Sequence, residues 1–352
     1  HPALEALFTI DEETGMTGAK GLEPGLLQGE ILLNLDTEED DEIGIGCAGG
    51  IDLTAARSYN EENTPKGSKA FKIILNGLKG GHSGMDIIKG LGNANKLMNR
   101  LLFSVSENLD LRISEINGGG LRNAIPRESE AIVVVDDLQE KVLLSELENE
   151  IQKIKDEFIK LEPNLAVSIT KVEVPKKVME TNAQEAVLKA VYVAHNGVYR
   201  MSPEIDGLVE TSNNVAKVAV KDGKVAVKCL TRSSVESSKD DLANGLRSGF
   251  ELAGFEVELS GDYPGWAPNR DSAILTVLDE LYQKMFHEKA DIAACHAGLE
   301  CGIIGNHYPE MDMISFGPTI RGAHSPDERA SIKSAQKYWK FVLEILKNIP
   351  NK

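Results

Sequence analysis

Two groups of carboxylates offer the first chemistry in the chain, and each directly follows an apolar segment. Three adjacent acids at residues 11–13 follow residues 3–10, which we predict to form a buried strand. Asp36 follows a second predicted strand at residues 30–35. In an α/β sheet the carboxyl ends of neighbouring strands meet at one edge, where ligands bind. Carboxylate oxygens suit hard or borderline metal ions. A solvated acidic loop is the alternative interpretation of either group.

A histidine near the end of the chain could complete this set. His324 stands among small residues just before a predicted helix, so its ring can point into a cleft. Together with Glu13 and Asp36 it makes a mixed carboxylate and imidazole set, of the kind that binds zinc in proteins. Taken alone, a histidine at this position could equally help to cap the helix.

Three further polar residues could contact a substrate. His82 lies in a glycine-rich turn at residues 80–84, where the backbone can approach closely and the ring could donate to an oxyanion. Asn123 offers both a donor and an acceptor, and Arg232 could bind a carboxylate through two hydrogen bonds. A tight turn with an incidental histidine, and ordinary surface positions, are the competing explanations.

The segments that must position these residues show two different patterns of predicted strands and helices. Residues 70–172 predict the order β-α-β-β-α-β, which is the split βαβ arrangement. Residues 182–260 predict a weaker version of it, with a hairpin at Asp222-Gly223. A polar stretch with Pro and Gly at residues 58–68 is typical of a linker. We therefore expect an α/β protein with an inserted α+β domain made of two ferredoxin-like lobes.

We place the domain boundaries where the pattern of predicted strands and helices changes. We expect the inserted domain at residues 57–260, and the outer sheet domain, flanked by helices, at residues 1–56 together with 261–352. The helices at residues 272–286 and 331–346 carry apolar residues at helical spacing and should cover the outer sheet.

Composition excludes several classes of function. The net charge of −17 argues against a nucleic-acid partner, since such proteins concentrate Lys and Arg. No apolar run is long enough for a membrane span, and no secretory signal is visible. The four cysteines form no C-x-x-C pair, so we expect free, mostly buried thiols and a cytoplasmic location.

Taken together, several strings of residues resemble the M20 metallopeptidases, and most closely their aminoacyl-histidine dipeptidase branch. They occur in family order along nearly the whole chain, which makes the resemblance specific. The strings are LFTIDEETGM at residues 7–16, NLDTEE at 34–39, GGHSG at 80–84, RNAIPRE at 122–128, HAGLE at 296–300, SFGP at 315–318 and RGAHSPDE at 321–328.

The resemblance implies a role for each residue of the metal and acid–base chemistry. Glu12 matches the general base, and Glu13 matches a ligand of one zinc ion, which it shares with His324. Asp36 matches a ligand of the other zinc ion. His82, on the inserted domain, matches the residue that stabilises the tetrahedral intermediate.

The resemblance also implies the substrate and its contacts. Asn123, Arg232 and Gly298 match substrate-binding positions, with Arg232 holding the free carboxylate of a small peptide. The implied protein is a cytoplasmic dinuclear zinc dipeptidase whose inserted domain acts as a lid, and cobalt or manganese are the other expected metals. A homodimer is an expected state because relatives often dimerise.

One departure from the family pattern affects the expected activity. The family has a His-x-Asp motif and a metal-bridging Asp before the Glu12-Glu13 pair, and the chain holds neither. We therefore expect an N-terminally truncated piece that binds metal poorly and turns over little. The alternatives are a tripeptidase, an N-acyl-amino-acid deacylase of the same superfamily, or a non-catalytic binding or scaffold protein.

Overall fold

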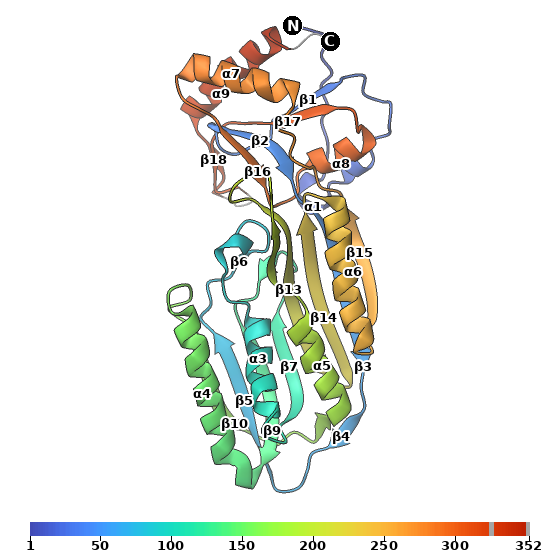
Figure 1. Ribbon diagram of the computed structural model, residues 1–352, viewed down its shortest axis with the longest axis vertical. Coiled ribbons are helices and arrows are strands. Elements are labelled where there is room, and N and C mark those ends of the chain that lie inside the picture. The colour runs from blue at the N-terminus through green and yellow to red at the C-terminus, as the bar shows by residue number, and fades with distance from the viewer. Residues whose placement is uncertain (324–326, 350–352) are drawn as a thin grey trace.

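The protein is built on two main sheets, one of four strands and one of nine, each covered by helices (Figure 1). The computed structural model describes residues 1–323 and 327–349. The smaller sheet and its helices form one end of the molecule, and the larger sheet forms the long remainder. A mixed α/β architecture, as predicted, is therefore confirmed. Within those described ranges, no helix combines the length and apolarity that crossing a membrane requires.

The smaller sheet has the strand order β1-β17-β2-β16. Its strands are β1 (Ile31–Asn34), β2 (Glu42–Cys47), β16 (Asp291–Cys295) and β17 (Asp312–Ser315). Neighbours β1 and β17 are parallel, as are β16 and β2. Ile43 and Ile45 alternate with glycines along β2, so both isoleucines are buried on one face, as the two-residue period of a strand requires.

Two helices complete the core of the smaller sheet. They are α7 (Ala273–Phe286) and α9 (Ile332–Lys347), close to the predicted helices. Ile274 and Leu278 of α7 and Phe341 of α9 are buried in the same cluster as Ile43 and Ile45. Such a stripe at three- and four-residue spacing is what seats a helix on a sheet.

The prediction of a buried strand at residues 3–10 is wrong. The described residues include no strand that pairs with this segment, and Leu4, Phe8 and Ile10 are exposed. A strand needs a neighbour for its backbone hydrogen bonds, and apolar composition alone does not provide one. Leu7 instead packs beside Ala19 and Ile304.

The larger sheet is antiparallel, in the order β10-β5-β9-β7-β13-β14-β3-β15, with β12 (Gly197–Met201) beside β13. Its other strands are β3 (Gly49–Ser58), β5 (Ser68–Asn76), β7 (Arg112–Gly119), β9 (Ser129–Asp136), β10 (Ala166–Val172), β13 (Val209–Lys221), β14 (Lys224–Ser233) and β15 (Glu256–Tyr263). The first of its two halves keeps the predicted order β-α-β-β-α-β.

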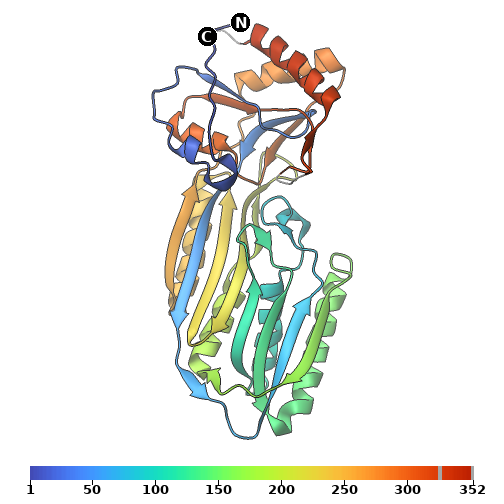
Figure 2. The same cartoon turned by 180° about the vertical axis from the view of Figure 1, so that it is seen from behind.

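Four helices cover one face of the larger sheet, and the reverse view shows the other face without helices (Figures 1 and 2). They are α3 (Ala94–Ser106), α4 (Glu140–Phe158), α5 (Thr181–Val193) and α6 (Glu236–Leu252). The predicted hairpin is confirmed: β13 and β14 pair up to Lys221 and Lys224, with Asp222 and Gly223 at positive φ between them.

The stretch expected as a linker and the strand before it take part in sheets. Residues 61–63 form the short strand β4 (Glu61–Asn63), which pairs with β11 (Lys177–Met179). Strand β3 lies in the larger sheet between β14 and the edge strand β15. The chain therefore enters the larger sheet at residue 49.

Candidate active site

The acidic pair Glu12-Glu13 lies in a tight turn at the junction of the two sheets. The turn is the short helix α1 (Glu12–Gly15), and Asp11 and Met16 on either side adopt left-handed backbone conformations, which are uncommon for residues other than Gly. The amide of Met16 donates to the carbonyl oxygen of Asp11 over 2.7 Å. A Cβ at Gly18 would lie 2.5 Å from the backbone nitrogen of Ile10, so this position requires glycine. The side chain of Glu13 is outside the described part.

Asp36 and the turn that carries Glu12 both adjoin helix α8 (Glu300–His307). Thr9, just before the turn, donates to Oε2 of the buried Glu300 over 2.7 Å. Asp36 is exposed, and its charge reaches Cys301: burial first, then the charges of neighbouring thiols and of Asp36, raise the pKa of this thiol. The N-terminal turn of α8 thus links the two acidic segments.

The predicted zinc shell lies partly outside the described residues. Glu13 is without a described side chain, and His324 falls in the gap at residues 324–326. Within the described ranges, no group of three or more His, Cys, Asp and Glu could hold a metal ion. Just before that gap, Arg321 forms two hydrogen bonds of 2.7 and 2.9 Å with Glu39, in the loop that follows Asp36. The convergence of Glu13, Asp36 and His324 stays a prediction.

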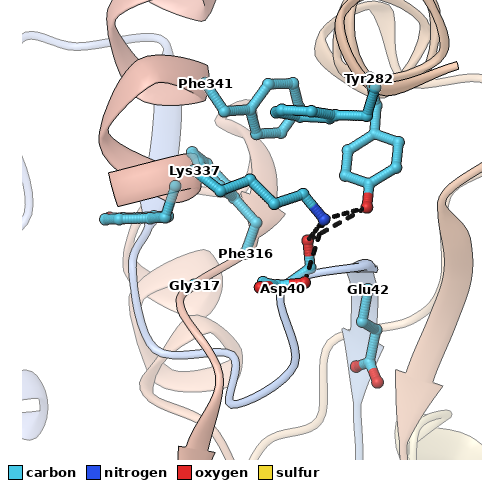
Figure 3. Close-up of a pocket in the computed structure, with 9 residues that line it drawn as sticks. Asp40, Glu42, Tyr282, Phe316, Gly317, Lys337 and Phe341 are labelled. Atoms are coloured by element: carbon cyan, nitrogen blue, oxygen red, sulfur yellow. Dashed lines mark hydrogen bonds and ion pairs between the residues drawn. The ribbon is translucent and has the colours of Figure 1, made fainter. Parts of the chain in front are cut away.

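A half-buried ion pair anchors the far end of the Asp36 loop (Figure 3). Lys337 of α9 donates to Oδ1 of Asp40 over 3.0 Å and to the hydroxyl of Tyr282 over 2.6 Å. Burial raises the pKa of Asp40, but hydrogen bonds from Ser334 and Lys337 outweigh it and leave this pKa lowered. The adjoining cavity encloses about 10 Å³, enough for one water molecule, so this cluster is structural.

A larger cavity of about 440 Å³ opens between α5 and α6. Among the described residues, none of the predicted site residues lines it or the small cavity beside Lys337. Neither cavity therefore marks the predicted site.

His82 is held in one orientation by its own turn. It lies in β6 (Gly81–His82), and its Nδ1 accepts hydrogen bonds from the amides of Gly84 and Met85 over 3.2 and 3.1 Å. A neutral ring with Nδ1 as acceptor carries its proton on Nε2, which is then a donor. A Cβ at Gly84 would lie 2.0 Å from the carbonyl oxygen of His296, so glycine lets this turn approach the outer domain.

Arg232 lies at the centre of the residues that the structure brings together. It is only 5% exposed, its Nη1 donates to the hydroxyl of Tyr263 over 2.7 Å, and its Nε lies 3.5 Å from the hydroxyl of Ser83. A Cβ at Gly298 would lie 3.1 Å from the ring of Tyr263 and 3.3 Å from the side chain of Met16. One chain of contacts therefore joins the His82 turn, Arg232, Gly298 and the Glu12 turn.

Among the described residues the buried guanidinium of Arg232 has no salt-bridge partner, and the charge of Asp52, which is paired with Arg122, acts on it from a distance. No carboxylate among the described residues forms a salt bridge with it, whereas the similarly buried Arg112 contacts Glu62 at 2.5 Å. An unpaired buried charge is costly, and a carboxylate with two oxygens matches the geometry of a guanidinium. This site is suited to an anionic group of a ligand.

Asn123 is joined to the same group through its backbone. The amide of Ser83 donates to the carbonyl oxygen of Asn123 over 2.8 Å, and His82 pairs with Ala124 in the small sheet of β6 and β8 (Ala124–Ile125). The side chain of Asn123 is exposed. His82, Asn123, Arg232 and Gly298 are thus brought together by the fold.

His296 is a buried residue of this region to which sequence reasoning assigned no role. Its Nε2 lies 2.7 Å from the hydroxyl of Ser212 on β13. Burial first, and then the charges of Arg232 and His82, lower the pKa of His296 to about 3, so the ring is neutral at neutral pH. Sequence reasoning also missed Tyr263 and Ser212. The polar run at residues 210–214, within an otherwise apolar strand, was the available signal for Ser212.

The thiols near the site are free and buried, as predicted. Cys47, Cys229 and Cys301 are buried, Cys295 is partly so, and none forms a disulfide. Burial raises the pKa of both Cys47 and Cys229 to about 12, so these thiols stay protonated at neutral pH. They pack as small apolar groups and supply no reactive thiolate.

Comparison with known proteins identifies the family of this chain. The family model described as "Peptidase family M20/M25/M40" matches residues 1–348. The cytosol non-specific dipeptidase of Escherichia coli (strain K12) is 46% identical over all of this chain and 73% of its own length. The crystal structure of aminoacylhistidine dipeptidase from Vibrio alginolyticus superposes with a TM-score of 0.94 at 43% identity, over 98% of this chain and 70% of that one. The chain therefore belongs to the M20/M25/M40 family of peptidases.

Proposed function

We propose that this protein hydrolyses dipeptides, including those of the Xaa-His type, by metal-assisted attack of water. The observation that carries the proposal is the buried guanidinium of Arg232, which has no carboxylate partner among the described residues. The free C-terminal carboxylate of a dipeptide supplies the missing charge. Because this guanidinium lies beside the His82 turn and Gly298, a bound carboxylate places the peptide bond between the two domains.

Each of the other site residues has a role in the proposed reaction. Nε2 of His82 donates to the carbonyl oxygen of the substrate as negative charge develops on it, and donors of this kind are typically worth about 10²–10³ in rate. Glu12 accepts the proton of the attacking water and passes it to the leaving amine. Asn123 and Gly298 line the substrate, and Tyr263 holds Arg232 in place.

Glu13, Asp36 and His324 are the residues that we propose to hold metal. Asp36 fits this role as an exposed carboxylate beside the N-terminal end of α8, which the Glu12-Glu13 turn also adjoins. Two zinc ions, or cobalt or manganese in their place, would polarise the scissile carbonyl and lower the pKa of the attacking water. The number and identity of the metals belong to this proposal.

The two sheets suggest domain boundaries that differ from those expected from the sequence. We propose a lid at residues 49–263, instead of 57–260, because β3 and all of β15 belong to the larger sheet. Residues 1–48 and 264–352 form the outer domain. We also propose a cytoplasmic location, which the name of the Escherichia coli relative supports, and a homodimer.

A substrate panel tests the proposed reaction. The protein is incubated with Xaa-His and other dipeptides, tripeptides and acetylated amino acids, with zinc and with a chelator. The proposal is supported if the protein hydrolyses dipeptides and the chelator abolishes this hydrolysis. Preference for tripeptides or acetylated amino acids would identify one of the alternative hydrolases, and binding without hydrolysis would identify a binding protein.

Two matched variants assign the chemistry to the site. Glu12→Gln keeps the size of the side chain and removes the base, so hydrolysis should fall to background while dipeptides still bind. Glu38→Gln changes an exposed acid in the nearby loop and should leave turnover unchanged. Zinc that the full chain retains after dialysis and that Asp36→Ala loses would support the proposed metal site; equal zinc content in both would contradict it.

A further inference from the structure

Several asparagines are buried inside the lid, where apolar residues usually pack, and two of them, Asn93 and Asn214, are hydrogen-bonded to each other. Asn93, Asn213 and Asn214 are each at most 3% exposed. Buried amides are costly unless every donor and acceptor finds a partner, so their hydrogen bonds show which parts of the fold they hold. Asn213 and Asn214 are adjacent on β13 and point to opposite faces of the sheet.

Asn214 holds the segment that carries Asn123. Its Nδ2 donates to the carbonyl oxygen of Arg122 over 3.0 Å and to that of Ala124 over 2.8 Å. These two carbonyls belong to the residues immediately before and after Asn123. Both amide hydrogens of Asn214 are therefore used to fix the backbone on either side of Asn123.

The same segment carries the His82 turn. Ala124 pairs with His82 in the small β6–β8 sheet, and the amide of Ser83 donates to the carbonyl oxygen of Asn123 over 2.8 Å. A shift of residues 122–124 therefore moves His82 as well. Asn214 lies two residues beyond Ser212, on the same face of β13 as the residue that binds His296.

The other end of the Asn214 side chain is held by the first lobe of the lid. Its Oδ1 accepts from Nδ2 of Asn93 over 3.3 Å, and Nδ2 of Asn93 also donates to Asn196 over 2.8 Å and to the carbonyl oxygen of Val215 over 3.1 Å. Oδ1 of Asn93 caps α3 by accepting from two backbone amides. Because Oδ1 of Asn214 is engaged in this way, its Nδ2 must face Arg122 and Ala124.

A second anchor holds the same segment to the sheet. The guanidinium of Arg122 contacts Asp52 at 3.0 Å and donates to the hydroxyl of Thr54 over 2.6 Å. It also donates to the carbonyl oxygens of Leu53 and Cys229, each over 2.8 Å. The residue before Asn123 is therefore fixed through its side chain to β3 and β14, and through its carbonyl to β13.

We propose that Asn214 is a positioning residue, which acts through the backbone of residues 122–124 to place Asn123 and His82 against the substrate. This inference rests on the proposed function of that site. Misplacing a group by about 1 Å can cost about 10²-fold in rate. Loss of Asn214 should therefore reduce kcat more than it raises KM, since His82 acts most strongly as charge develops on the substrate.

Asn213 provides a matched control on the opposite face. It is fully buried, its Nδ2 donates to the carbonyl oxygen of His195 over 2.7 Å, and its Oδ1 accepts from Thr231 over 3.1 Å. Asn213→Ala removes a similar side chain and a similar number of hydrogen bonds from the same strand. It leaves the contacts to residues 122–124 in place.

The test compares the two variants in the full chain. Asn214→Ala should lower kcat about 10- to 100-fold with KM changed by less than about 3-fold, whereas Asn213→Ala should keep kcat within about 2-fold. Hydrogen exchange at the amide of Ser83 should accelerate in Asn214→Ala only. Equal losses of kcat in both variants, or unchanged exchange at Ser83, would overturn the proposal.

Two outcomes would prevent a comparison of kcat, and each has its own test. If Asn214→Ala does not fold, Asn214→Asp retains the shape and places an oxygen against the carbonyls of Arg122 and Ala124, so the same losses are expected. If the unmodified protein hydrolyses no dipeptide, the proposed function fails. The exchange comparison at Ser83 then still decides whether Asn214 holds the segment.

Discussion

Replacing Arg232 by methionine should lower activity without a matching loss of stability. Arg232 is 5% exposed, with one good hydrogen bond to Tyr263 at 2.7 Å and a marginal contact to Ser83 at 3.5 Å. Loss of a hydrogen bond to a charged group costs about 1.5–3 kcal/mol, while removing a buried, unpaired charge recovers several kcal/mol. The free energy of unfolding of Arg232→Met should therefore stay within about 1 kcal/mol of the original value or rise above it.

The effect of the same substitution on the reaction should be large. Removing one partner of a desolvated charge pair typically costs about 2–5 kcal/mol, which corresponds to a loss of roughly 30- to 5,000-fold in kcat/KM for a dipeptide. The lost partner binds the ground state as well as the transition state, so a higher KM should account for much of the loss.

Arg112→Met is the matched control, because Arg112 is also buried but is paired with Glu62 at 2.5 Å and bonded to the carbonyl oxygen of Met179. It should lose about 1–3 kcal/mol of stability and keep its kcat/KM. Urea unfolding followed by circular dichroism, together with dipeptide hydrolysis, measures both quantities. If Arg232→Met is destabilised as much as Arg112→Met and still binds dipeptides normally, the guanidinium is not reserved for substrate.

Three further predictions concern burial and charge. Burial lowers the pKa of His296 from about 6.5 in the unfolded state to about 3 in the folded protein, so the unfolded state binds more protons as the pH falls below 6.5. The free energy of unfolding should therefore drop by about 4 kcal/mol between neutral pH and pH 3 because of this residue. In urea unfolding, His296→Asn should lose less stability at acid pH than the original protein. Because burial raises the pKa of Cys47 to about 12, this thiol should not react with a thiol reagent at pH 8 until the protein unfolds; rapid native labelling, located by mass spectrometry, would contradict this. Lys337→Met leaves Asp40 and Tyr282 without their shared donor and should cost about 1–3 kcal/mol in urea unfolding, and an unchanged midpoint would show that the ion pair is not stabilising.

Local patterns predicted much of the larger sheet and its helices. The second helix of the order β-α-β-β-α-β expected within residues 70–172 is α4 (Glu140–Phe158), with Leu143, Leu147 and Ile154 buried along one face. The Asp222-Gly223 hairpin also formed as predicted. These features depend on side-chain periodicity and on turn residues, both of which are written locally in the chain.

Features that depend on a distant partner were not predictable from local pattern. Residues 3–10 have the apolar composition of a strand but no pairing strand among the described residues. Strand β16 was missed because its pairing with β2 joins residues about 250 positions apart. In the site, resemblance to a family singled out Arg232, but only the fold shows that its charge is buried and which side chains hold it.

Strands β13 and β14 run from the end of the larger sheet that carries Ser212 and Arg232 to the hairpin at its far tip, with one register shift between Val215 and Lys217. From Ser212 to Asp222 there are ten residues, or about 34 Å at the usual rise of a strand. A rotation of the larger sheet by about 10° around the Ser212 end would therefore move the hairpin tip by about 6 Å, although residues near Ser212 would shift far less. A spectroscopic probe attached at Asp222 would report such a rotation from a position remote from the proposed site.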